Sequence, residues 1–220
     1  WEESFPRYKA EALDPVTNKM SKLMLNEKIA RVFSQRKGKI QWRSIIDEGR
    51  IFLARLTGLG PGNTSFVGSL IIAGFKEAAC SRADTPPNMR RPFSLYIDEF
   101  HRFPTSSIED LLTESRKYAV SIRLAHQETG QIDYSTRRAV GTADTIIAFC
   151  VDVEDAKHLT KEFHKEISED DLLRLSRGEA YARINHEIVD IVTLKPPDDP
   201  AEDVVPAIIA KSRQKYYVKR

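Results

Sequence analysis

Short apolar runs alternate along this chain with longer segments in which apolar residues recur every three or four positions. The first pattern is typical of buried strands and the second of helices with one buried face. The predicted strands are residues 51–56, 93–97, 120–125 and 145–151. The predicted helices are residues 64–81, a segment that opens near 104–107 and runs to 118, and residues 152–164, followed by a shorter one after Ser168.

This order of strands and helices predicts an α/β fold with a mostly parallel sheet flanked by helices. Residues 178–184 and 187–194 are predicted to form a late antiparallel hairpin around Asn185-His186. Three regions follow. Residues 1–44 are a helical segment, residues 45–195 hold the α/β domain, and residues 196–220 are a linker rich in proline and aspartate with a basic tail.

One predicted strand, residues 93–97, runs directly into two carboxylates, Asp98 and Glu99. Burying an unpaired carboxylate costs several kcal/mol, so the pair needs either a cation or solvent. Two interpretations fit: a Walker B strand that holds the Mg²⁺ of a nucleotide, or a core strand that ends at a solvated acidic turn. The next strand ends at His126-Gln127, and ligands of parallel sheets bind beyond the carboxyl ends of the strands. Polar residues at the ends of two strands therefore favour the interpretation of this region as a ligand-binding site.

The glycine-rich segment 57–65, between a predicted strand and a helix, is a poor candidate for a phosphate-binding loop. A Walker A loop needs a lysine after its last glycine, whereas Gly62 is followed by Asn63. A Rossmann pattern also fails, because Asn63 stands where the third glycine belongs. In the helix that follows, Gly68 and Gly74 predict close packing against a neighbouring element.

Three stretches together resemble the second half of the motor domain of HerA/FtsK-superfamily ATPases. They are Phe-Ser-Leu-Tyr-Ile-Asp-Glu-Phe at 93–100, Leu-Leu-Thr-Glu-Ser-Arg-Lys-Tyr at 111–118, and Leu-Ala-His-Gln at 124–127. The resemblance is greatest to conjugative coupling proteins of the TraG/TraD type and their type IV secretion relatives, and it spans about residues 45–195. It implies a RecA-like domain, present here as its C-terminal half.

The resemblance also implies roles for particular residues. Asp98 would coordinate Mg²⁺, Glu99 would be the catalytic carboxylate, and Gln127 would be the sensor of the γ-phosphate or the lytic water. Arg116 would be an arginine finger offered to the nucleotide of a neighbouring subunit. The alternative for Arg116 is a surface arginine that pairs with an acidic residue of its own helix, Glu109 or Glu114.

ATP and Mg²⁺ are therefore the expected cofactors of an ATPase that moves DNA for conjugation or secretion. The expected partners are further copies of the chain in a hexameric ring, DNA, and a relaxase or other secretion-system proteins. In the family the Walker A lysine lies upstream of a helical insertion, and residues 1–40 resemble the end of that insertion. We therefore expect a fragment that is inactive alone, cytoplasmic, with any membrane anchor in an upstream region.

Two other functions are compatible with parts of the sequence. Asp98-Glu99-Phe100-His101 matches the Asp-Glu-x-His of superfamily-2 helicases, but their Ser-Ala-Thr and Gln-x-x-Gly-Arg-x-x-Arg elements are missing. A non-catalytic module that assembles a secretion complex or recruits its substrate stays open, because an incomplete nucleotide site would behave in that way. A Walker A motif upstream of Trp1 would separate the two classes.

Composition limits how nucleic acid could bind. The 220 residues carry a formal net charge of only +2, so contact with DNA has to come from local patches such as Arg137-Arg138. Cys80 and Cys150 lie in apolar surroundings without a pattern, which predicts buried free thiols in a reducing compartment.

Overall fold

The computed structural model describes residues 14, 17–18, 21, 25–35, 38–103, 106–198 and 203–216. Half of the predicted N-terminal helical segment, residues 1–44, therefore lies outside the described residues. Within it, α2 (Glu27–Phe33) is helical, as expected, and a helix that was not expected, α3 (Trp42–Asp47), crosses the predicted boundary at residue 44. The basic tail, predicted only as a short segment, contains a further helix, α9 (Val205–Tyr216).

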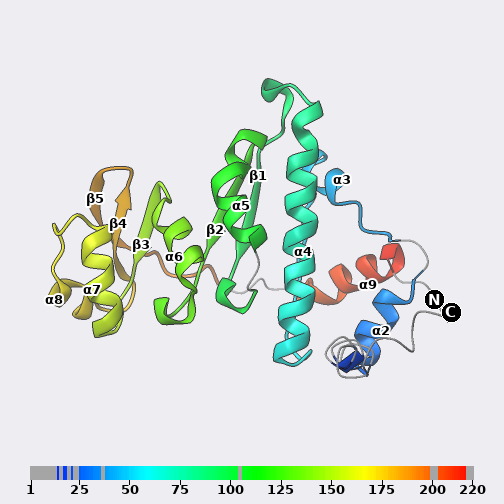
Figure 1. Cartoon of the computed structure of the whole chain (residues 1–220), viewed down its shortest axis with the longest axis horizontal. Helices are drawn as coiled ribbons and strands as arrows, with labels where there is room; N and C mark the ends of the chain where they lie inside the picture. Colours follow the sequence, from blue (N-terminus) through cyan, green and yellow to red (C-terminus); the bar gives the residue numbers. More distant parts are fainter. Residues whose placement is uncertain are drawn as a thin grey trace.

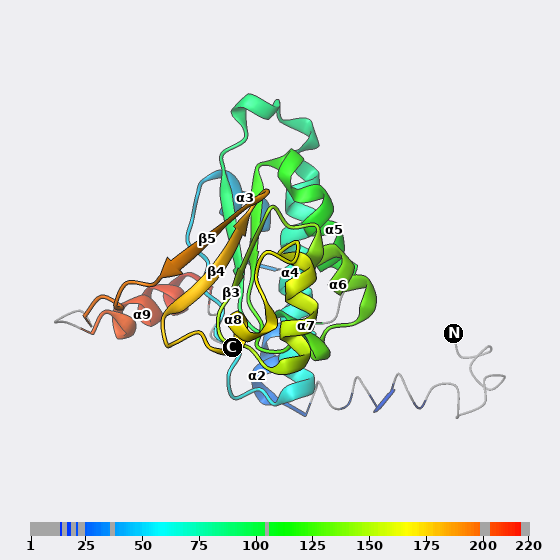
Figure 2. The ribbon, with the colours of Figure 1, turned by 90° about the vertical axis from the view of Figure 1, so that its left-hand side faces the viewer.

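The first structural unit is a pair of parallel strands packed against helices. It comprises α4 (Pro61–Ser81), β1 (Phe93–Ile97), α5 (Ser106–Glu114) and β2 (Val120–Leu124). The strands run in register from Phe93 opposite Val120 to Ile97 opposite Leu124. Figure 2 shows α4 and α5 on one side of these strands. The sequence-based prediction of both strands and both helices is confirmed.

The second unit is an antiparallel sheet in the order β3-β4-β5 with its own helices. It comprises α6 (Tyr134–Gly141), β3 (Thr145–Ala148), α7 (Val153–Glu162), α8 (Glu169–Leu173), β4 (Glu179–Ile184) and β5 (Glu187–Val192). The predicted hairpin is confirmed, with Asn185 in the left-handed turn conformation at φ 56°. However, β3 does not extend the parallel sheet as predicted, because it pairs antiparallel with β4. Figure 1 shows the two units side by side.

Short 3-10 turns join these elements. They are η2 (Arg82–Asp84), η3 (Pro87–Met89), η4 (Phe100–Arg102), η5 (Ser115–Tyr118) and η6 (Thr129–Gln131). Two of them matter for the site, because η4 follows the end of β1 and η6 follows the end of β2.

The core of the first unit lies between the strands and α4. Phe75 is buried and packs against the rings of Trp42, Phe52 and Phe93 at centroid distances of 5.0, 5.5 and 5.6 Å. Close packing at the two helix glycines is confirmed. A Cβ atom at Gly68 would lie 2.2 Å from the Phe103 ring, and one at Gly74 would lie 2.6 Å from the indole of Trp42.

Two predictions from apolar runs are wrong. Residues 51–56 have no regular secondary structure and belong to no strand ladder among the described residues, and Ile51 and Leu53 are 89% and 76% exposed. Only Phe52 and Leu56 of this run pack against the cores, because an apolar run indicates a tendency to burial and does not provide a pairing partner. Both cysteines are free, but Cys150 is exposed and Cys80 is half-buried.

Among the described helices, none combines the length and the apolar character needed to cross a bilayer. The longest, α4, is 21 residues and packs its apolar side chains into the core described above.

Candidate active site

The candidate site begins at the point where β1 ends. Glu99 adopts a left-handed conformation with φ 50° and ψ 44°, which is uncommon for a residue with a side chain. The Oδ1 atom of Asp98 accepts a hydrogen bond from the Glu99 backbone N–H at 3.0 Å. The next residue, Phe100, is buried, and its N–H donates to the carbonyl of Ala125 beyond the end of β2. The turn therefore ties both strand ends together and redirects the Glu99 side chain.

Two side chains contact the Glu99 carboxylate, one on each oxygen. The Gln127 Nε2 atom donates to Oε1 at 2.7 Å, and His101 Nδ1 lies 3.4 Å from Oε2. The Glu99 and His101 side chains are only 23% and 14% exposed, whereas Asp98 is exposed beside them. The structure thus brings together Asp98 and Glu99 from the end of β1 and Gln127 from the end of β2.

His126, which precedes Gln127, packs next to this site. Its ring lies edge-on to Phe100 at a centroid distance of 5.2 Å. Burial lowers the pKa of His126 below its ordinary value, against the smaller opposing effect of Asp155. The imidazole is therefore neutral at pH 7, and it adds no positive charge next to the carboxylates.

The segment after Gln127 is held by two residues to which sequence reasoning gave no role in the site. Asp155, in the first turn of α7, is buried, and its carboxylate accepts hydrogen bonds from the N–H and the hydroxyl of Thr129. Arg137 Nη2, from α6, donates to the carbonyls of Thr129 and Ile132 at 2.6 and 3.2 Å. Arg137 is thus used inside the fold and not on a DNA-facing patch.

The sequence held one signal for Asp155, since a carboxylate in the first turn of a helix is typical of helix N-termini. That signal predicts a stabilising residue for α7 but not the contact with Thr129, which depends on how the two units pack. Arg137 carried no signal, because a pair of arginines on a polar helix is usually solvent-exposed.

Arg116 lies at the other end of the strand pair. It belongs to η5, which precedes β2, whereas Asp98 and Gln127 follow β1 and β2. Its side chain is 90% exposed and contacts Asp144 Oδ2 at 3.3 Å, instead of the predicted alternatives Glu109 or Glu114. A strand of this length spans about 16 Å at roughly 3.3 Å per residue, so Arg116 cannot reach Asp98 of its own chain.

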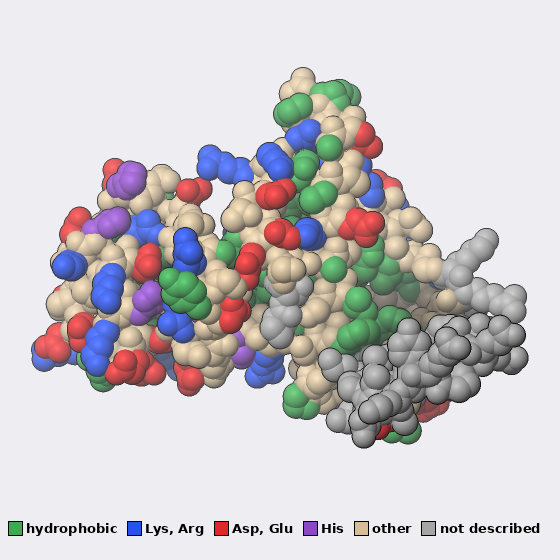
Figure 3. Space-filling model, viewed as in Figure 1, with side chains coloured by type: hydrophobic (Ala, Val, Ile, Leu, Met, Phe, Trp, Pro, Cys, Tyr) green, Lys and Arg blue, Asp and Glu red, His purple; other side chains and the backbone are tan. Residues whose placement is uncertain are grey.

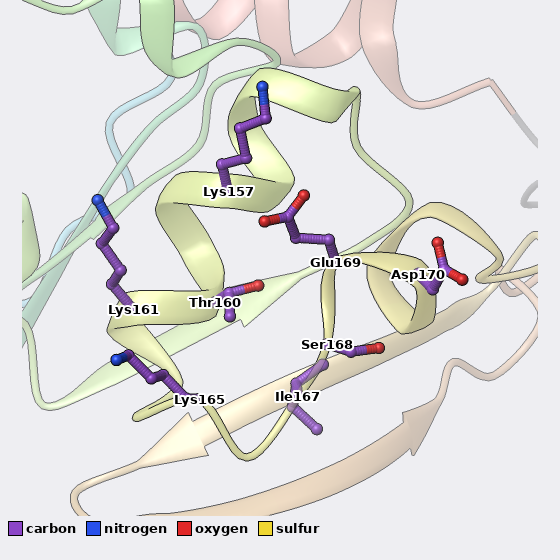
Figure 4. Close-up of a pocket in the computed structure, with 8 residues that line it drawn as sticks. All are labelled: Lys157, Thr160, Lys161, Lys165, Ile167, Ser168, Glu169 and Asp170. Atoms are coloured by element: carbon purple, nitrogen blue, oxygen red, sulfur yellow. The ribbon is translucent and has the colours of Figure 1, made fainter.

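Two hollows accompany these elements. One, of about 360 Å³, lies under the segment after Gln127 and is lined from both units, by His126, Thr129 and Ile132 and by Ala148, Asp155 and His158. The other, of about 610 Å³, lies between α7 and α8. In it Lys157, Lys161 and Lys165 point in three different directions (Figure 4), so their charges do not converge on one ligand position.

The charges on the surface are mixed. On the face drawn in Figure 3, acidic and basic side chains lie interspersed over both units, in keeping with the low net charge.

The described residues offer one group that a magnesium-bound nucleotide needs, a carboxylate for the metal ion. Among the described residues, the Asp98 carboxylate accepts a bond only from the Glu99 N–H, so its other oxygen is available to a hard cation that prefers oxygen ligands. The segment 57–60 before α4 brings no lysine to this position. The phosphate-binding half of a nucleotide site is not supplied by these residues.

No known protein family and no curated protein matches the chain. Solved structures do resemble it. The conjugative coupling protein TrwB in complex with ADP and Mg²⁺ matches with a TM-score of 0.54 and 15% identity, over 64% of this chain and 39% of TrwB. The unbound bacterial TrwB matches with a TM-score of 0.53 and 16% identity, over 62% of this chain and 38% of that one.

A second protein gives a similar result. VirB4 of Thermoanaerobacter pseudethanolicus matches with a TM-score of 0.50 and 16% identity, over 64% of this chain and 40% of VirB4. The chain thus spans about two-fifths of the length of these proteins. Identities this low establish the fold alone. The predicted α/β fold, seen here in part, is confirmed at that level, and the chain is similar in fold to the conjugative coupling protein TrwB and to VirB4.

Proposed function

We propose that this chain carries the hydrolytic carboxylates of an ATP-driven motor of the conjugation and type IV secretion kind. One observation supports this most. The hydrogen bond between Gln127 Nε2 and Glu99 Oε1 joins an amide and a carboxylate from the ends of two parallel strands, beside the exposed Asp98. Ligands of such sheets bind at this end.

Each residue has a distinct task in the proposal. Asp98 is the residue that would hold Mg²⁺, and the bound ion supplies neutralisation of phosphate charge. Glu99 orients the attacking water and accepts its proton. Gln127 can donate and accept hydrogen bonds through its neutral amide, which suits a group that contacts both a phosphate oxygen and the water.

The proposal needs phosphate-binding groups from outside residues 1–220, because no Walker A lysine occurs among them. The experiments below therefore use the intact protein. We propose DNA as the transported substrate, since TrwB, to which the chain is similar in fold, is a conjugative coupling protein. A relaxase or other secretion-system proteins, and a membrane anchor elsewhere in the protein, are part of the same proposal.

The position of Arg116 supports assembly into a ring. It is exposed at the amino end of the strands, and its contact with Asp144 joins two groups that are 90% and 69% exposed, so the pair contributes little stability and separates easily. We propose that Arg116 stabilises charge on the nucleotide bound by the adjacent copy, in a hexameric ring.

The main test is Glu99→Gln in the intact protein. ATP binding should be retained and turnover should fall by about a hundredfold or more, since the general base is lost. Glu109→Gln is the matched control. It makes the same chemical change at the same end of the sheet, where Glu109 Oε1 lies 2.7 and 3.2 Å from the hydroxyl oxygens of Ser135 and Thr136. Equal turnover of the wild type and Glu99→Gln would refute the catalytic role.

A complementation experiment tests the assignment of Arg116. Arg116→Ala and Glu99→Gln should each be inactive when pure. Mixed rings should regain activity, because some interfaces then combine an intact Glu99 with an intact Arg116. Failure of every mixture to exceed the pure variants would exclude action between subunits. A wild type that binds DNA or secretion proteins but never hydrolyses ATP would instead favour the non-catalytic assembly module.

A further inference from the structure

We infer that Asp155 is a positioning residue for Gln127, so that helix α7 of the second unit sets the geometry of the site at the end of the first. The inference rests on the proposed function and deepens it. It concerns residues 126–132, which we call the Gln127 loop.

The contact between Asp155 and Thr129 carries the inference. Asp155 is 5% exposed, and the Thr129 N–H lies 3.2 and 3.1 Å from its two carboxylate oxygens. The Thr129 hydroxyl donates to the same carboxylate. A buried carboxylate is tolerated only where donors satisfy it, so these bonds fix Thr129 relative to α7.

The Gln127 loop is held from the second unit by two helices, α6 and α7. The cavity of about 360 Å³ lies beneath it, between the loop and β3, and its last residue, Ile132, is buried in the core of the first unit. Its carbonyls at Thr129 and Ile132 are held by Arg137, which belongs to α6. Asp155 is therefore the charged group through which α7 holds the loop.

This contact bears directly on the site, because Thr129 is two residues from Gln127. A path of short contacts leads from Asp155 to Thr129, along the backbone to Gln127, and through its amide to Glu99 at 2.7 Å. A misplacement of about 1 Å in a reacting group can cost a hundredfold in rate. Any shift of α7 against the parallel strands would move Gln127 through this path.

Asp155→Asn tests the inference in the intact protein. The carboxamide offers one oxygen where two now accept, and its NH₂ group competes with the Thr129 N–H. We expect kcat to fall by about tenfold or more while the KM for ATP stays within about twofold, since the contact acts on the transition state and not on nucleotide binding.

The matched control is Ser168→Ala. Ser168 caps α8 in the same unit through a capping box with Asp171, so its loss weakens this unit without touching the Gln127 loop. Hydrogen exchange supplies a readout independent of activity. The Thr129 amide should exchange faster in Asp155→Asn and unchanged in Ser168→Ala. A kcat for Asp155→Asn equal to that of Ser168→Ala, or unchanged exchange at Thr129, would overturn the inference.

If Asp155→Asn does not fold, a second pair of variants tests whether the contact between Asp155 and Thr129 positions Gln127. Thr129→Val keeps the shape but removes the hydroxyl donor, and should lower kcat, whereas Thr129→Ser restores the hydroxyl and should recover it. Equal kcat in both would overturn the inference. Failure of the proposed function is distinguishable, because it would appear as full turnover in Glu99→Gln, whatever these variants do.

Discussion

The two ends of the β1–β2 pair use the same backbone device for different purposes. Ala119 at the amino end and Glu99 at the carboxyl end both adopt left-handed conformations, at φ 57° and 50°. Around Ala119 the backbone is satisfied. Its N–H donates to Arg116 O, and its carbonyl accepts from Phe93 N–H, both at 3.0 Å. Around Glu99 the turn aims a carboxylate at the amide of Gln127. One turn completes the fold, and the other builds a site.

The charged groups at the two ends also differ, in their burial and in the number of bonds they make inside the fold. Arg82, at the amino end, is 1% exposed and donates to the carbonyls of Tyr118 and Arg91 at 2.7 Å, while its Nε lies 3.0 Å from Asp47. Asp98, at the carboxyl end, is exposed and accepts a single bond from the described residues. Charges paired inside the fold indicate structure, whereas available lone pairs at the end of a parallel strand indicate a candidate site.

The largest effect is expected from Arg82→Ala. It removes a buried guanidinium that donates to two backbone carbonyls and lies against Asp47, so we expect the free energy of unfolding to fall by about 3 kcal/mol or more. Urea denaturation at pH 7 measures it. The control is Arg43→Ala, because Arg43 also binds Asp47 but its side chain is 32% exposed, and its loss should cost about 1 kcal/mol or less. Equal losses in the two variants would remove the distinction between the ends.

Gln127→Ala, at the carboxyl end, should lower turnover and leave the free energy of unfolding almost unchanged. Turnover should fall by about tenfold to a hundredfold, since one positioned polar contact is lost. The free energy of unfolding should change by less than about 0.5 kcal/mol, because Gln127 is exposed. Steady-state kinetics and urea denaturation on the same preparation check both. Gln127→Glu should be no more active than Gln127→Ala, because it places a second carboxylate against Glu99.

Glycine at the two left-handed positions gives a smaller effect. Ala119→Gly and Glu99→Gly should each stabilise the fold by about 0.5–1 kcal/mol, because glycine adopts this conformation without strain. Turnover should be retained in Ala119→Gly and lost in Glu99→Gly. Thermal unfolding and ATPase assays would show this. A destabilised Ala119→Gly would mean that the methyl group of Ala119 contributes packing that outweighs the strain.

Much of this organisation could be predicted from the sequence. The run at residues 93–97 and the carboxylates after it predicted both β1 and its polar carboxyl end, because a buried strand and the residues that follow it are local features. Gln127 followed from the rule that parallel strands present ligands at a common end. In contrast, residues 51–56 have the same apolar character as β1 but no described ladder partner, and local pattern cannot distinguish the two.

What could not be predicted depends on contacts distant in sequence. The buried role of Arg82 requires carbonyls from the turn before β1 and from η5, and the role of Asp155 requires Thr129, 26 positions away. The antiparallel pairing of β3 with β4 is of the same kind. Each depends on how complete elements pack, and neither periodicity nor spacing encodes that directly.

A further small effect tests whether every carboxylate near the carboxyl end belongs to the site. Asp133 caps α6, and hydrogen bonds from the Ser135 hydroxyl and from the N–H and hydroxyl of Thr136 lower its pKa from 3.8 to about 2. Because the folded pKa lies below the unfolded one, the stabilisation is present above about pH 4 and is lost as the pH falls toward 2. Asp133 is exposed, so solvent screening reduces the contribution to about 1 kcal/mol.

Asp133→Ala should therefore cost about 1 kcal/mol at pH 7 and progressively less below pH 4, with turnover unchanged. Urea denaturation at pH 7 and at pH 2.5 measures the difference. Asp133→Asn is the control, because asparagine also caps helices but does not titrate, so its own stability should lack this pH dependence. A loss of turnover in Asp133→Ala at full folding would place Asp133 with Asp98 and Glu99. The contrast between satisfied and available carboxylates would then no longer separate structure from function at this end of the sheet.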